Sequence, residues 1–166
     1  NRYTGNMGDS YIRPSGKLND IYGNEYERGL AIWIARWNAG HEKSWAWVKY
    51  NINNEYEYLQ SDLVLVPSNN TTNFDTILDF YGDGKLLGSY EFRATDLPIK
   101  VAVNVSGVNE LKIYFHDNEY TGWGTRLGLA NCRLSYELDE SYGDEKTEFY
   151  KWMNNMPTLP ESEARK

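Results

Sequence analysis

The sequence is poor in the residues on which small enzymes and metal sites depend. It has one cysteine, Cys132, and two histidines among 166 residues. A lone thiol excludes a disulfide within the chain and a zinc site built from several cysteines. The sequence has no nucleophile elbow, phosphate loop or zinc motif, and no carboxylate pair in a setting typical of a glycosidase. We therefore expect no catalytic activity, and we interpret Cys132, whose neighbours are apolar, as a packed thiol.

Long apolar runs and an excess of positive charge are also missing. No run approaches the roughly 20 residues of a membrane-spanning helix, so we expect no insertion into a membrane. The net charge of −7 argues against a nucleic-acid partner, because phosphate binding requires a positive face. Residues 137–166 hold eight acids and four bases and so supply −4 of that charge. The sequence begins at Asn1 without a leader, and we expect it to be an excised module of a longer protein.

The chain is instead rich in aromatic residues and in strand-like alternation. Its 14 tyrosines and six tryptophans exceed the needs of one core of this size. Apolar and polar residues alternate with period two, which predicts strands at residues 30–37, 44–52, 56–66, 76–81, 85–92, 99–105, 111–116 and 125–136. Gly82-Asp83-Gly84 and Ser106-Gly107 predict turns between strands. The sequence thus predicts one all-β domain, an antiparallel β-sandwich.

The two ends of the chain differ from this pattern. Residues 1–20 are polar and contain glycine, and we expect them to wrap the edge of the sandwich rather than build its core. Residues 148–153 carry an apolar stripe that predicts a short helix, which Pro157 and Pro160 end. We therefore divide the chain into a sandwich module at 1–136 and an acidic capping segment with a linker at 137–166. A plain linker over 137–166 is the alternative.

Several stretches resemble a known family. Residues 80–87 (Phe-Tyr-Gly-Asp-Gly-Lys-Leu-Leu) and 103–113 (Val-Asn-Val-Ser-Gly-Val-Asn-Glu-Leu-Lys-Ile) resemble the NPCBM family, which overlaps family 51 of the carbohydrate-binding modules. Residues 26–30 and 48–52 extend the likeness, which spans about Gly23 to Leu134. The resemblance implies a galactose-binding-like jelly roll, usually attached to secreted glycosidases, that docks sugars with loops at one end. It also implies a structural calcium ion and an extracellular or cell-surface location in a bacterium.

The chain departs from this family at two places that matter for sugar binding. Trp33 stands where the family commonly has a histidine shortly after its Gly-Leu pair. Residues 125–129 read Thr-Arg-Leu-Gly-Leu where the family has Asp-His-Ala-Asp-Trp. The polar groups tied to galactose are therefore largely missing, and we expect binding by tryptophan stacking rather than by galactose-type polar contacts.

Residues 116–124 form the leading candidate for a ligand loop. Sugar recognition combines an aromatic face, which stacks on the C–H side of a pyranose, with a few fixed hydrogen-bonding groups. This segment holds two aromatic residues among polar ones, and its glycines allow sharp turns. The candidate ligands are His116, Asp117, Tyr120, Trp123 and the following Arg126. In the alternative interpretation, Tyr120 and Trp123 fold back over the edge of the core.

A second candidate binding surface follows from the positions of four tryptophans, which lie an even number of residues apart within each of two predicted strands. If strands 30–37 and 44–52 form a hairpin, one sheet face carries the four indoles of Trp33, Trp37, Trp45 and Trp47. The indoles then either form an exposed platform for a polysaccharide or pack under terminal segments that contain Phe149, Tyr150 and Trp152. Trp33, Arg36 and Trp37 join the candidate ligands because they lead into the loop at 38–43.

The implied calcium ion needs six to eight oxygen ligands. Asp117, Asn118, Glu119 and Asn131 supply candidate oxygens, and the alternative is that these are solvated loop residues. Together the sequence favours a non-catalytic, monomeric carbohydrate-binding module of a secreted or cell-surface protein. It would hold catalytic or cell-surface domains of the same parent chain near a poly- or oligosaccharide. The alternative is a protein-interaction or structural domain of a surface or sensor protein whose sugar site has degenerated.

Overall fold

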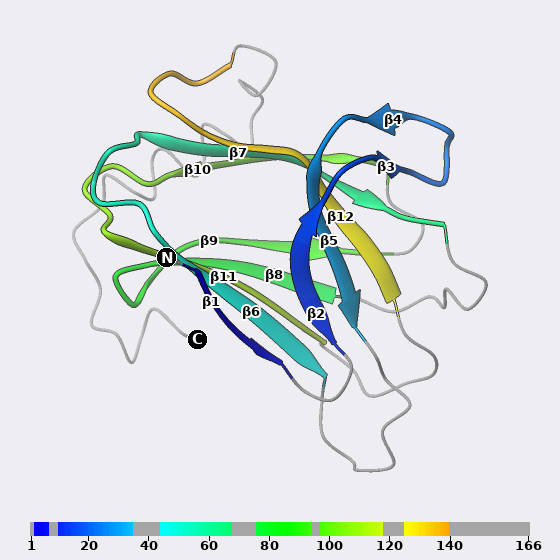
Figure 1. Cartoon of the computed structure of the whole chain (residues 1–166), viewed down its shortest axis with the longest axis horizontal. Helices are drawn as coiled ribbons and strands as arrows, with labels where there is room; N and C mark the ends of the chain where they lie inside the picture. Colours follow the sequence, from blue (N-terminus) through cyan, green and yellow to red (C-terminus); the bar gives the residue numbers. More distant parts are fainter. Residues whose placement is uncertain are drawn as a thin grey trace.

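The computed structural model describes residues 2–6, 10–34, 44–67, 76–93, 97–117 and 125–139, and its regular structure in these ranges consists of β-strands. Two five-stranded antiparallel sheets pack against each other (Figure 1). Sheet A runs in the order β1 (Arg2–Asn6), β6 (Trp45–Asn51), β11 (Glu110–Asp117), β8 (Thr76–Gly82) and β9 (Lys85–Phe92). Sheet B runs in the order β10 (Ile99–Asn104), β7 (Tyr58–Leu65), β12 (Thr125–Ser135), β5 (Gly29–Ile34) and β2 (Tyr11–Ser15). A small hairpin joins β3 (Leu18–Asn19) to β4 (Glu25–Tyr26).

The predicted antiparallel sandwich is therefore confirmed, and its core follows from the alternation of the strands. On sheet A, Ala46, Val48, Ile113 and Phe115 are at most 1% exposed. They face the buried Leu30, Ile32, Ile34, Leu63, Leu127 and Leu129 of sheet B in one cluster. Burial of one such side chain contributes about 1.5–3 kcal/mol, so this shared core is the main source of stability. The helix predicted at 148–153 lies outside the described residues.

The N-terminal segment contributes more to the fold than its polar composition suggests. The prediction that residues 1–20 only wrap the edge is wrong, because β1 and β2 are the edge strands of sheets A and B. Ile12 is 3% exposed in the main core. Leu18 packs on the outer side of sheet B against Val64 and Ala130. This second cluster explains why β7 is buried on both faces.

One buried carboxylate organises the loop between β3 and β4. Asp20 is 2% exposed and accepts hydrogen bonds from the amides of Tyr22 and Asn24, both at 2.9 Å. It also accepts hydrogen bonds from Asn24 Nδ2 at 2.8 Å and from the Tyr26 hydroxyl at 3.3 Å. Burial acts to raise the pKa of Asp20, but the hydrogen bonds from Asn24, Tyr22 and Tyr26 outweigh it and lower the pKa below its ordinary value.

The two turns predicted from glycine-containing sequences are present. Asp83 and Gly84 join β8 to β9 with φ of 48° and 83°, as a two-residue hairpin turn requires. The Asp83 carboxylate accepts hydrogen bonds from the amides of Asn109 at 3.1 Å and Glu110 at 2.8 Å. Gly107, with φ of 80°, lies in the turn that precedes β11. The hairpin is thus tied to the neighbouring turn at this end of the sandwich.

A buried amide fixes the chain where it leaves β12. Gln60 is 1% exposed, and its Nε2 donates to Ser135 Oγ at 2.6 Å and to the carbonyl of Glu137 at 2.9 Å. Its Oε1 accepts a hydrogen bond from the amide of Asp139 at 2.9 Å. Residues 135–139 are thereby held beside β7.

The prediction that strands 30–37 and 44–52 form a hairpin is wrong. β5 pairs with β12 and β2, whereas β6 pairs with β1 and β11 in the other sheet. Trp33 therefore lies on the outer side of sheet B, and Trp45 and Trp47 lie on the outer side of sheet A. Two strands that each have one apolar side can bury those sides equally well as neighbours in one sheet or in two sheets that face each other across the core. In this structure the two strands lie in opposite sheets. Trp37 lies outside the described residues.

Candidate functional site

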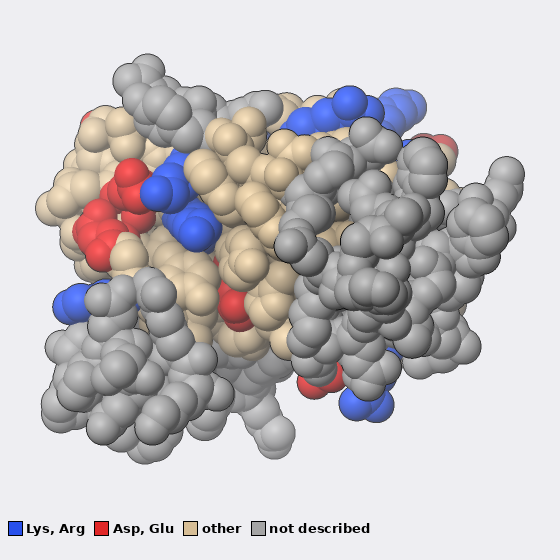
Figure 2. Space-filling model, turned by 90° about the horizontal axis from the view of Figure 1, so that it is seen from below, with Lys and Arg blue, Asp and Glu red and all other residues tan. Residues whose placement is uncertain are grey.

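The outer side of sheet A gathers aromatic and polar side chains from three adjacent strands. β6 contributes Trp45, Trp47 and Lys49, β11 contributes Lys112, Tyr114 and His116, and β8 contributes Asp79 and Tyr81. We call these eight residues the aromatic face. In the strand register, Trp47, Tyr114 and Asp79 form one transverse row, and Lys49, Lys112 and Tyr81 form the next. In Figure 2, the view from below, lysine and arginine (blue) and acidic (red) atoms lie among uncharged residues (tan) in the part of the surface that the structure describes.

Trp47 lies over the neighbouring edge strand. Gly5 of β1 is its register partner, and a Cβ at Gly5 would fall within 2.5 Å of Cζ2 and Nε1 of the indole. The absence of a side chain at Gly5 therefore leaves the space that the indole fills. The ring is half-buried in this position.

Lys112 stands at the centre of three aromatic rings. Its Nζ lies 5.1 Å from the ring centroid of Tyr114, 5.5 Å from that of Trp47 and 5.6 Å from that of Tyr81. The Nζ of Lys49 lies 5.4 Å from the Trp47 ring centroid and pairs with Glu110 at 3.3 Å. Such cation–π contacts contribute about 0.5–1 kcal/mol each at exposed sites and hold the rings in place.

A chain of hydrogen bonds fixes the other end of the aromatic face. The Nε2 of His116 lies 2.8 Å from Asp79 Oδ2, and Ser89 Oγ donates to Asp79 Oδ1 at 2.6 Å. The His116 ring stacks on Tyr114 with centroids 4.7 Å apart and planes at 21°. Burial and the nearby Asp79 charge raise the pKa of Tyr114, so its hydroxyl stays protonated at neutral pH. The face thus offers ring surfaces beside a fixed imidazole and hydroxyl.

The residues predicted from sequence as ligands fall on two different faces. His116 belongs to the aromatic face on sheet A. Trp33 and Arg126 are register partners on the outer side of sheet B, with the guanidinium 4.9 Å from the indole centroid. Asp117 is the last residue of β11. The other predicted ligands, Arg36, Trp37, Tyr120 and Trp123, lie outside the described residues.

The sequence interpretation missed Tyr81, Lys112, Tyr114 and Asp79. All four are the outward members of alternating strands, a signal the sequence does contain. What it lacks is the pairing of β11 with both β6 and β8, which brings them into one surface.

The structure describes only two of the four predicted calcium ligands, Asp117 and Asn131. Asn118 and Glu119 lie outside the described residues, and Asn131 lies within β12, with φ of 50° and its amide bonded to the carbonyl of Arg28 at 2.8 Å. In the part of the chain that the structure describes, no group of three or more His, Cys, Asp or Glu side chains is placed to hold a metal ion. Calcium binding stays a prediction.

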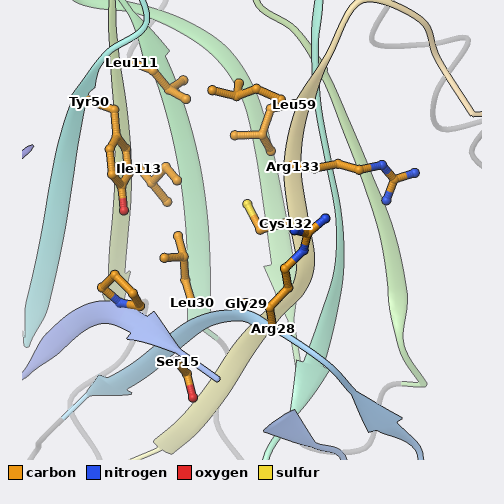
Figure 3. A pocket seen from close by; sticks show the side chains of 12 residues that line it. Ser15, Arg28, Gly29, Leu30, Tyr50, Leu59, Leu111, Ile113, Cys132 and Arg133 are labelled. Atoms are coloured by element: carbon orange, nitrogen blue, oxygen red, sulfur yellow. The ribbon is translucent and has the colours of Figure 1, made fainter. Parts of the chain in front are cut away.

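A pocket of about 340 Å³ opens between the two sheets (Figure 3). Its walls come from both sheets and are mainly core side chains, Leu30, Leu59, Leu111, Ile113 and Leu134, with Tyr50 and Cys132. Arg28 and Arg133 also line it, and Arg133 pairs with Asp139 at 3.1 Å. A sugar carries several hydroxyl groups that need hydrogen-bonding partners, so these apolar walls suit it poorly.

The thiol of Cys132 behaves as the sequence predicted. It packs against the main core, and burial raises its pKa to about 11, although Ser61 and Arg133 act in the opposite direction. A thiol with such a pKa is protonated at neutral pH and is a poor nucleophile.

Comparisons with known proteins bear on the fold. No family model matches the chain, and no curated protein matches it in sequence. Among solved structures, it is similar to the M60 catalytic domain with the CBM51-1 and CBM51-2 domains of ZmpB from Clostridium perfringens (12% identity, TM-score 0.58). It is similar also to CBM51-2 in complex with GlcNAc and INT domains of the same protein (13%, TM-score 0.58). A third is the CBM51 of GH95 from Clostridium perfringens in complex with methyl-galactose (16%, TM-score 0.53).

The chain has the β-sandwich fold of these modules. The matches cover 81%, 81% and 80% of this chain, and 14%, 29% and 92% of the three structures respectively. The predicted galactose-binding-like sandwich is thereby confirmed, while the NPCBM resemblance stays a prediction. In the described ranges, no helix has the length and apolar character to cross a membrane.

Proposed function

We propose that this domain is a non-catalytic carbohydrate-binding module that binds a glycan on the aromatic face of sheet A. The observation that carries the proposal is the set of ring surfaces from Trp47, Tyr81 and Tyr114, side by side with fixed polar groups, on one side of a carbohydrate-binding-module fold. Its structural neighbours include modules solved with GlcNAc and with methyl-galactose. A neutral hexose or N-acetylhexosamine glycan is therefore the ligand class to test first.

The face supplies both parts of sugar recognition. Tyr114 and Trp47 give half-buried rings on which the C–H side of a pyranose can stack. His116 and Lys112 give polar groups beside those rings, and Asp79 keeps the imidazole in one orientation at 2.8 Å. Because the rings and the imidazole are already held by neighbours, little side-chain freedom is lost on binding.

The parent protein is proposed to be extracellular or attached to the cell surface. Domains of the same fold occur beside a catalytic domain in ZmpB, in a structure of which this chain matches only 14%. We infer that this module likewise holds other domains of its parent chain close to a glycan, and that it acts as a monomer.

Affinity electrophoresis and a glycan array with neutral glycans test the proposal. Tyr114→Ala should weaken retention by about tenfold, because it removes the central ring of the aromatic face. Tyr22→Ala is the matched control, since Tyr22 is half exposed in the turn between β3 and β4, on the side of sheet B. Thermal unfolding of both variants confirms that they are folded.

Two results would sink the proposal. One is that the native domain is retained by none of the neutral glycans. The other is that Tyr22→Ala and Tyr114→Ala lose the same affinity, which would place the ligand elsewhere or show a non-specific effect. The sequence-based alternative, a protein-interaction domain with a degenerate sugar site, would then be favoured.

A further inference from the structure

A second row of aromatic and cationic side chains lies on the opposite side of the molecule. Tyr11 of β2, Trp33 of β5 and Arg126 of β12 are direct register partners across three adjacent strands of sheet B. Arg13 stands two residues after Tyr11 on the same side of β2. We call these four residues the arginine–aromatic row. Their inward neighbours Ile12, Ile32 and Leu127 are buried in the core, so the row faces outward.

Each arginine of the row is stacked on a ring. The Arg13 guanidinium lies 4.0 Å from the Tyr11 centroid and donates a long hydrogen bond of 3.4 Å to the Tyr11 hydroxyl. The Arg126 guanidinium lies 4.9 Å from the Trp33 centroid. Stacking of this kind restricts a long side chain and leaves the N–H edges of the planar group free to donate. The two guanidinium groups are thus oriented before any ligand arrives.

Among the residues that the structure describes, neither arginine has an acidic partner, although the protein carries a net charge of −7. Other basic side chains do have acidic partners, as Lys100 has Asp62 at 2.9 Å and Arg133 has Asp139 at 3.1 Å. Arg13 and Arg126 are both exposed, and within the described ranges no carboxylate pairs with either of them. Two cations without an acidic partner in the described ranges, on one surface of an acidic protein, create a local site for anions.

The spacing of the row suits a polymer with repeated charges. β2 and β12 flank β5, so their backbones lie about 10 Å apart, which is two strand spacings. Guanidinium groups bind carboxylate and sulfate oxygens through paired N–H donors, and the Tyr11 and Trp33 rings lie between them as apolar surface. We propose that the arginine–aromatic row binds an acidic glycan, one whose sugar units carry carboxylate or sulfate groups. This site is separate from the aromatic face and does not depend on it.

Affinity electrophoresis of the whole chain in polygalacturonate, in dextran sulfate and in uncharged dextran tests the inference. The native domain should be retarded more strongly by at least one polyanion than by dextran. Arg13→Gln and Arg126→Gln should each weaken that retention about three- to tenfold, with a larger loss in the double variant. Lys85→Gln is the control, because it removes the same charge from an exposed position at the hairpin between β8 and β9.

The two polyanions distinguish a carboxylate ligand from a sulfate ligand, and retention by either supports the inference if it requires both arginines. Retention should also fall as sodium chloride is raised. No retention by either polyanion, or equal losses in Lys85→Gln and Arg126→Gln, overturns the inference. Binding of neutral glycans should be unchanged in Arg126→Gln, so this test and that of the aromatic face can fail separately.

Discussion

Substitution of Gly5 by alanine should weaken glycan binding on the aromatic face while leaving the fold nearly intact. The new methyl group would fall within 2.5 Å of Cζ2 and Nε1 of Trp47, closer than non-bonded carbon atoms allow. β1 is paired with β6 through five residues, so its backbone cannot easily withdraw. The indole is the part that must move, and it would leave the position in which it borders Tyr114 and Lys112.

The effect of Gly5→Ala on glycan binding differs in size from its effect on folding stability. Loss of one stacking surface costs about 0.5–1.5 kcal/mol of binding free energy, which is about a two- to twelvefold increase in Kd. Overpacking of a closed core costs about 1–3 kcal/mol, but the Trp47 ring lies half-buried on the outer side of sheet A rather than in the core, so the loss should fall below that range. For a domain of this size that is a fall in Tm of less than about 3 °C.

Titration with a neutral glycan and thermal unfolding of the same samples check this prediction. Gly16→Ala is the control, because a Cβ at Gly16 would meet nothing within 4 Å. Tryptophan fluorescence should also shift in Gly5→Ala, since the indole becomes more exposed. If Gly5→Ala binds the glycan as the native domain does, Trp47 takes no part in binding. If it unfolds at a much lower temperature, the indole is a fixed part of the fold rather than a movable ligand contact.

Three further predictions concern stability and reactivity. The lowered pKa of Asp20 means that its stabilisation is complete above the pKa of the unfolded chain, about 3.9, and is lost as the pH falls through the folded value. Asp20→Asn should therefore reduce the fall in Tm between pH 5 and pH 2.5, and an unchanged profile would refute this. Gln60→Leu should lower the free energy of unfolding by about 1–3 kcal/mol and speed hydrogen exchange of the Asp139 amide, because it removes the hydrogen bonds that hold residues 135–139. Gln60→Glu would keep the acceptor oxygen for the Asp139 amide but replace the donating Nε2 with a second acceptor, and full stability in that variant would contradict the assignment. Cys132, with a pKa of about 11, should react with a thiol reagent at pH 8 far more slowly in the folded domain than in the unfolded chain, and equal rates would contradict this.

Local features of the sandwich could be predicted from the sequence because their causes are local. Alternation with period two predicted β5 through β12 to within a few residues, since it reflects one buried side per strand. The Asp83-Gly84 turn was predictable because only certain residues adopt positive φ at both positions. The segment 1–20 was misjudged because its strands lie at sheet edges, where one side of the backbone and most side chains face solvent.

The aromatic face could not be predicted as a unit. Trp45 and Trp47 were correctly placed on one side of their strand, but their partner strand was not β5. The true neighbour, β11, follows β6 by almost sixty residues, and no turn between them specifies the pairing. Tyr114 and His116 therefore had no visible link to Trp47 until the sheet order was known.

The sequence by itself determined that this chain is an antiparallel sandwich, which side of each strand is apolar, and that Cys132 is a packed thiol. Those properties depend on residue type and on neighbours within a few positions. Only the tertiary structure decided that Trp33 lies on the opposite face from Trp45 and Trp47, that Lys112 lies among three rings, and that Arg13 and Arg126 stand in one row. These depend on which strands pair, and a strand with one apolar side has several partners that bury it equally well.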